Sequence, residues 1–122
     1  MSPDETNPQR SAAGAQQARD LAEVPAVEVV TTVAVHLMSA AAVKLGLADE
    51  PDAAGHTDLD EARTLITALA GLVTAAAPEL GPFHAAPLRD GLQTLQRAFR
   101  EASAHPDPPG QGPGESIAAA RP

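Results

Sequence analysis

Few side chains in this chain of 122 residues have the types and spacing that chemistry needs, and the first group centres on a histidine. His36 lies within a long apolar stretch, and Thr32 and Glu28 precede it at four-residue steps, which places all three on one face of a helix. A histidine oriented by a carboxylate can act as a general base. No nucleophile or second acid accompanies it, so we interpret His36 as an exposed or interface histidine and predict no catalytic residue.

The second group is an acidic loop of twelve residues, Glu50–Glu61, between two expected helices. An EF-hand calcium loop has ligands or a glycine at positions 3, 6, 9 and 12, which here are Asp52, Gly55, Asp58 and Glu61. Position 1 is Glu50 instead of Asp, and Ala54 at position 5 offers no ligand. We therefore predict no metal site and no cofactor, although cation binding by this loop stays an open alternative.

Composition excludes several classes of function. The chain has no Cys, which excludes disulfides and Cys-ligated zinc or iron–sulfur centres. Sixteen acidic and eight basic residues give a net charge of −8, and this sign opposes binding to nucleic acid and to anionic membranes. Phe83 and Phe99 are the only aromatic residues, too few to stack bases. We expect neither a nucleic acid nor a membrane as a partner.

The apolar pattern predicts three helices, and the first covers residues 25–45. Pro25 suits the first position of a helix, and Gly46 suits the left-handed residue that ends one. The stretch is rich in β-branched residues, but its length without a turn signal favours a helix over a strand. Its longest charge-free run, residues 29–43, is shorter than the roughly 20 residues that a membrane crossing needs.

The second and third helices are amphipathic. Thr57 or Asp58 is the expected N-cap of the second helix, which we expect to end before Pro78. The third helix runs from about Phe83 to Ala102, with Pro87 in its first turn. Apolar residues recur at helical spacing in both: Leu59, Ala62, Ile66, Leu69 and Val73, then Leu88, Leu92, Leu95 and Phe99.

Both ends of the chain look unfolded by composition. Residues 1–23 are polar and resemble no secretory signal, so we predict a disordered or partly helical tail and a cytoplasmic protein. Residues 103–122 contain five Pro and three Gly, which predicts a disordered tail; whether it serves as a binding motif stays open. The predicted fold class is all-α, a small three-helix domain over residues 24–102 with a possible frayed N-terminal helix.

The first helix is apolar on most of its circumference, and two short partner helices cover only about half of such a helix. Small domains often make up for a small core by self-association. We therefore predict a homodimer or a higher homo-oligomer built around this helix. Its predicted self-association surface consists of Val30, Ala34, Leu37, Met38, Ala41 and Leu45.

Three segments carry a resemblance to a known family: VVTTVAVHLMSAAAVKLGL, DLDEARTLITALAGLV and LRDGLQTLQRAFREA. In their order and spacing they resemble a bacterial family known as domain of unknown function 1844, and the tail DPPGQGPGE resembles actinobacterial members. The segment TAAAPELGPFH departs from the Lys/Thr-rich turn with Gly-Asn that members often have before the last helix. The resemblance implies a small helical bacterial protein with no established activity and no catalytic residues to carry over.

Two hypotheses about function follow. The first is a non-enzymatic helical interaction module that self-associates and binds another, unidentified protein. The alternative is a small ligand-binding or hydrolase-type protein with an apolar pocket in which His36 or Glu28 is the polar group. Titratable groups converging on one pocket would favour the alternative.

Overall fold

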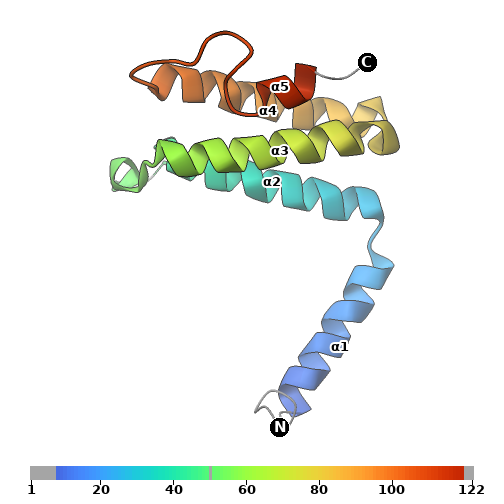
Figure 1. Cartoon of the computed structure of the whole chain (residues 1–122). Coiled ribbons are helices and arrows are strands. Elements are labelled where there is room, and N and C mark those ends of the chain that lie inside the picture. The colour runs from blue at the N-terminus through green and yellow to red at the C-terminus, as the bar shows by residue number, and fades with distance from the viewer. Residues whose placement is uncertain (1–7, 50, 120–122) are drawn as a thin grey trace, which may run out of the picture.

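The computed structural model describes residues 8–49 and 51–119, and within them the regular structure is entirely helical (Figure 1). The predicted all-α class is confirmed. Three long helices, α2 (Ala26–Lys44), α3 (Leu59–Leu80) and α4 (Pro82–Ala102), pack against one another as a bundle. The elements outside the bundle are α1 (Pro8–Glu23), the short 3₁₀ helix η2 (Ala53–His56) and α5 (Glu115–Ala119).

The expected end of α2 is confirmed in detail. Gly46 has a φ of 78°, the left-handed conformation that only glycine adopts without strain. The amide of Gly46 donates to the carbonyl of Val43 (3.0 Å), and the amide of Leu47 donates to the carbonyl of Ala42 (2.9 Å). This pair of bonds is a Schellman motif, which satisfies the last carbonyls of the helix and turns the chain toward α3.

The N-cap of α3 is also confirmed, whereas the predicted end of α3 before Pro78 is wrong. Asp58 Oδ1 accepts a hydrogen bond from the amide of Glu61 at 3.1 Å. The helix continues through Pro78 and ends at Gly81, whose φ of 82° breaks the helical path. Pro82 takes the first position of α4, so Pro87 lies in the second turn instead of the first. The helical path breaks at Gly81 because its backbone leaves the helical conformation. Pro78 and Pro87 each remove one backbone hydrogen bond but do not end the helix in which they lie.

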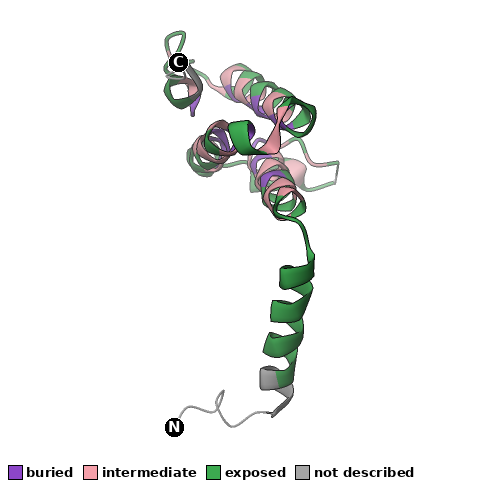
Figure 2. Ribbon diagram, turned by 90° about the vertical axis from the view of Figure 1, so that its right-hand side faces the viewer, coloured by how far each residue is buried: buried purple, intermediate pink, exposed green. Residues whose placement is uncertain are grey.

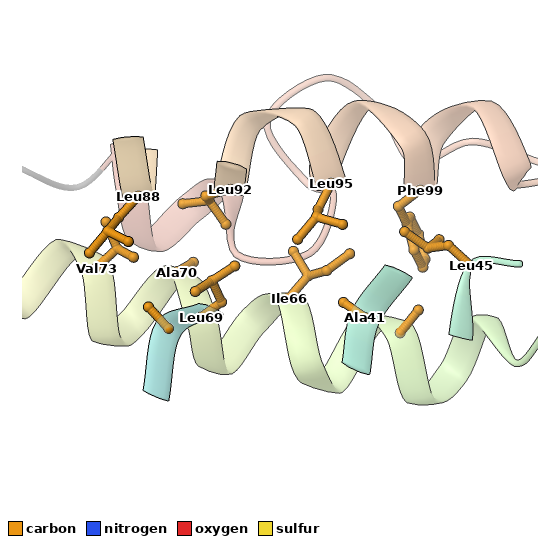
Figure 3. Close-up of a cluster of buried hydrophobic side chains, with 12 residues drawn as sticks. Ala41, Leu45, Ile66, Leu69, Ala70, Val73, Leu88, Leu92, Leu95 and Phe99 are labelled. Atoms are coloured by element: carbon orange, nitrogen blue, oxygen red, sulfur yellow. The ribbon is translucent and has the colours of Figure 1, made fainter. Parts of the chain in front are cut away.

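The core lies along α3, and its apolar spacing is as predicted. Ile66 and Leu69 of α3 are fully buried, and α4 faces them with Leu88, Leu92, Leu95 and Phe99 (Figure 3). From α2 come Ala34, Ala41 and Leu45. Burying each of the large side chains stabilises the fold by roughly 1.5–3 kcal/mol, so these rows hold the three helices together.

The N-terminal region is helical from Pro8 to Glu23, in line with the predicted partly helical tail; residues 1–7 lie outside the described part of the chain. Figures 1 and 2 show α1 standing away from the bundle, joined to α2 by Val24 and Pro25. Every side chain described in α1 is exposed. An isolated helix of this length is only marginally stable in water, so α1 depends on local interactions unless another surface covers it.

Residues 103–119 differ from the predicted disordered tail, and residues 120–122 lie outside the described part. After α4 the chain turns back over the bundle and places α5 against α3 (Figure 1). Pro113 and Gly114 are buried there. Composition argued against packing because Pro lacks a backbone donor and Gly costs more to order. Here Gly114, with a φ of 72°, instead lets the backbone approach α3 closely.

Candidate functional site

The predicted self-association surface lies mainly inside the chain's own core, which corrects its assignment. Ala34 and Ala41 are fully buried and Leu45 is 6% exposed. Leu37 and Met38 pack against this core, and Val30 is half-buried. The side of α2 that carries these two alanines is covered by α3 and α4 of the same chain.

The outer side of α2 carries apolar side chains that the described part of the chain leaves open. Ala34 and Ala41 are the only fully buried residues of this 19-residue helix. Val33 and Val35, on different sides of it, are 46% and 49% exposed. By length and composition alone, α2 is apolar enough to cross a membrane, a property it shares with the core helices of globular proteins.

A groove opens where α1 meets α2, and we call it the α1–α2 groove. It has a volume of about 370 Å³ and is lined by Leu21, Val24, Glu28, Val29, Thr32 and Val33. Leu21 is 54% exposed. Glu28 is the only ionisable group in this lining, so the groove is mainly apolar.

A second hollow of about 390 Å³ bears on the pocket hypothesis. It is lined by Val27, Glu28, Thr31, Thr32 and His84. Glu28 and His84 of α4 therefore line one hollow, while His36 is exposed on α2 and lines neither hollow. Phe83, 85% exposed, meets the ring of His84 edge-on with a centroid distance of 5.2 Å. The polar groups that line this hollow thus include Glu28 and a histidine that the sequence did not single out.

The acidic loop uses its described side chains for local structure. His56 Nε2 lies 3.1 Å from Asp52 Oδ2, both exposed, and Asp58 caps α3. Glu50 lies outside the described residues. Over residues 8–49 and 51–119, no group of three or more His, Asp or Glu is arranged to hold a metal ion.

A third surface, which the sequence interpretation missed, lies between α3 and α4 under the C-terminal segment. Arg100 of α4 donates to the carbonyl of Asp107 (3.2 Å) and to Glu115 Oε1 (3.3 Å). Arg63 pairs with Asp107 Oδ2 at 2.9 Å, and its guanidinium lies 5.0 Å from the ring centre of Phe99. The available signal was Glu115, an acid opening a short helix-forming run after Pro113 and Gly114.

Comparison with known proteins identifies the bundle. A family model described as "Domain of unknown function (DUF1844)" matches residues 26–101. The chain belongs to the DUF1844 family. The match begins with α2 and ends one residue before the end of α4, so α1 and the C-terminal segment lie outside the DUF1844 domain. None of the curated proteins and none of the solved structures matches the chain.

Proposed function

We propose that this DUF1844 protein is a non-enzymatic interaction module that forms a homodimer through the α1–α2 groove. The observation that supports this is the poor coverage of α2, an apolar helix with only two fully buried residues. A helix that is apolar on most sides is stable in water only when most sides are covered. Exposed apolar surface of this kind commonly marks a contact between proteins.

A second copy is the proposed occupant because it can cover the apolar side chains on both walls of the groove, α1 and α2. In a two-fold contact the same surface of each copy meets its equivalent. The groove brings Leu21 of α1 and Val33 of α2 to one apolar surface, so α1 of one copy can cover α2 of the other. The contact would also give α1 the tertiary packing that its own chain does not provide in the described structure.

Charge gives the proposal a dependence on salt. Each chain carries a net charge of −8, so two copies repel at long range. The groove itself holds only Glu28 among ionisable groups, so the contact is apolar and the repulsion comes from elsewhere on the surface. Raising the ionic strength screens that repulsion and is expected to strengthen the dimer.

The experiment compares two substitutions on the same helix by light scattering coupled to size-exclusion chromatography. Val33→Lys places a charge in the groove, whereas Val35→Lys places the same charge about 160° around the helix, outside it. The two valines are almost equally exposed, so the intrinsic cost to the helix is matched. We expect the wild-type chain and Val35→Lys to show twice the chain mass of 12.4 kDa, and Val33→Lys to show the single mass.

Two results would contradict the proposal. A wild-type chain that keeps the single mass up to high concentration refutes self-association. If that monomer instead binds uncharged lipid vesicles, the apolar side of α2 serves a membrane. Equal loss of the dimer in both variants places the contact elsewhere on α2.

The cytoplasmic location and an unidentified protein partner remain predictions from the sequence.

A further inference from the structure

The C-terminal segment is bound to α3 and α4 as a peptide ligand is bound to a groove. Between residues 103 and 117 the buried residues are Pro113 and Gly114, and the remainder is half-buried or exposed. Gln96 Nε2 of α4 donates to the carbonyl of Pro113 at 3.0 Å. A short buried centre with polar contacts around it is also the pattern of a contact between two proteins. We call the surface beneath it the α3–α4 groove, formed by Arg63, Ile66, Ala70, Gln96 and Arg100.

The centre of this contact is selective for glycine. Gly114 has a φ of 72°, and a Cβ at this position would collide with the side chain of Ala70. It would also lie 3.4 Å from the carbonyl oxygen of Ile66. The distance to the Ile66 oxygen is an ordinary contact, but the Ala70 Cβ is fixed to the backbone of α3 and cannot move aside cheaply. The groove therefore accepts a Pro-Gly step and rejects a larger residue in place of the glycine.

At the rim of the contact, charged side chains of the segment lie opposite side chains of the bundle with the opposite charge. Asp107 and Glu115 of the segment meet Arg63 and Arg100 of the bundle. Glu115 Oε1 also accepts the amide of Gly112 at 2.8 Å, which fixes the turn that presents Gly114. The chain has only eight basic residues and a net charge of −8. The bundle surface that carries Arg63 and Arg100 therefore differs in charge from the chain as a whole.

The α3–α4 groove belongs to the DUF1844 domain, whereas the segment that occupies it does not. The groove residues lie within the matched residues 26–101, and the occupant lies outside them. A stretch rich in Pro and Gly, residues 103–112, tethers the occupant, and most of it is exposed. Such a tether keeps the local concentration of the occupant on the order of millimolar, so it occupies the groove without being part of the bundle.

We propose that the α3–α4 groove is a docking site for an acidic Pro-Gly-Glu turn. A second copy of this chain supplies the turn when the groove's own occupant is displaced. The occupant opens independently of the three-helix bundle. The second copy is the assigned source because its residues 103–119 carry the same Asp107, Gly114 and Glu115 that the groove already holds. This proposal uses none of the residues of the α1–α2 groove, so either proposal can fail without the other.

The test makes the groove vacant in the full-length chain and supplies the segment separately. Gly114→Ala adds the colliding Cβ, while Gly110→Ala is the matched control. Gly110 has a similar φ, 83° against 72°, but open space where the Cβ would be. A fluorescent peptide of residues 103–119 is titrated into each full-length protein and followed by anisotropy.

We expect the peptide to bind Gly114→Ala saturably and to bind the wild-type and Gly110→Ala chains at least tenfold more weakly, because there the tethered segment competes. A peptide that itself carries Gly114→Ala should bind none of them. Equal binding to all three proteins, or no binding to a Gly114→Ala chain of unchanged helix content, overturns the proposal.

If Gly114→Ala lowers the helix content, hydrogen exchange in the wild-type chain decides. The amide of Gly112 should then exchange at least tenfold faster than those of Ile66 and Ala70 in α3. Equal protection would show that the segment opens only with the bundle, and the proposal would be wrong.

Discussion

Two glycines in the middle of the DUF1844 bundle give opposite predictions for the same substitution. Gly71 lies within α3 and Gly91 within α4. Glycine in a helix costs about 0.8–1.0 kcal/mol relative to alanine because it loses more backbone freedom on folding. A Cβ at Gly71 meets nothing within 4 Å. Gly71→Ala is therefore expected to raise the free energy of unfolding by about 1 kcal/mol.

At Gly91 the same gain meets a steric cost. A Cβ there would lie 2.7 Å from Met38 Cε and 2.8 Å from Met38 Sδ, across the α2–α4 contact. The thioether must rotate away, and crowding of this kind costs typically about 1–3 kcal/mol in a packed interior. Methionine is flexible, so the low end of that range applies. We expect Gly91→Ala to be neutral or to lower the free energy of unfolding by about 1 kcal/mol.

Urea denaturation followed by far-UV circular dichroism measures both values, at one fixed protein concentration because a dimer adds to apparent stability. For a domain of this size, the gain at Gly71 corresponds to roughly 4–8 °C in melting temperature. In a Met38→Ala background the collision is absent, so Gly91→Ala should there raise the free energy of unfolding by about 1 kcal/mol. If Gly91→Ala matches Gly71→Ala in the wild-type background, the assigned α2–α4 packing is refuted.

The remaining predictions concern the core and the cap. Ala41→Glu buries an unpaired carboxylate at a fully covered site, so we expect loss of helix content in circular dichroism, whereas a folded chain with altered mass would return Ala41 to an interface. Asp58→Ala removes the side-chain bond to the amide of Glu61 and should lower the free energy of unfolding by about 1 kcal/mol in urea titration. A change at Asp58 smaller than about 0.3 kcal/mol would show that water replaces the cap.

The helices and their buried rows were predictable because they follow from local rules. Ile66 and Leu69 recur at helical spacing, and the same spacing places Leu92 and Leu95 on one face of α4. Gly46 ends α2 because the left-handed conformation is available to glycine, and Asp58 begins α3 because its carboxylate accepts a backbone amide. Each of these rules involves residues within a turn or two of each other.

The surfaces were not predictable, because they depend on which partner covers each side. Periodicity cannot orient α2, since it is apolar almost all round, and Ala41 and Val33 look equally suited to an interface. The structure separates them, with Ala41 covered by its own chain and Val33 open. Composition likewise failed for residues 103–119, because the average cost of ordering glycine does not show that one particular glycine, Gly114, fits against Ala70.

The two grooves differ in what covers them, and this difference decides at which groove a partner binds more tightly. On the α3–α4 side the chain supplies its own cover, so a partner there must first compete with a tethered segment. On the outer side of α2 the described residues leave Val33 and Val35 about half exposed, and α1 stands clear of the bundle (Figure 2). A second copy that binds at the α1–α2 groove displaces only water, so the same apolar area yields more affinity there. Dimerisation through α2 is therefore expected at lower concentration than exchange of the C-terminal segment.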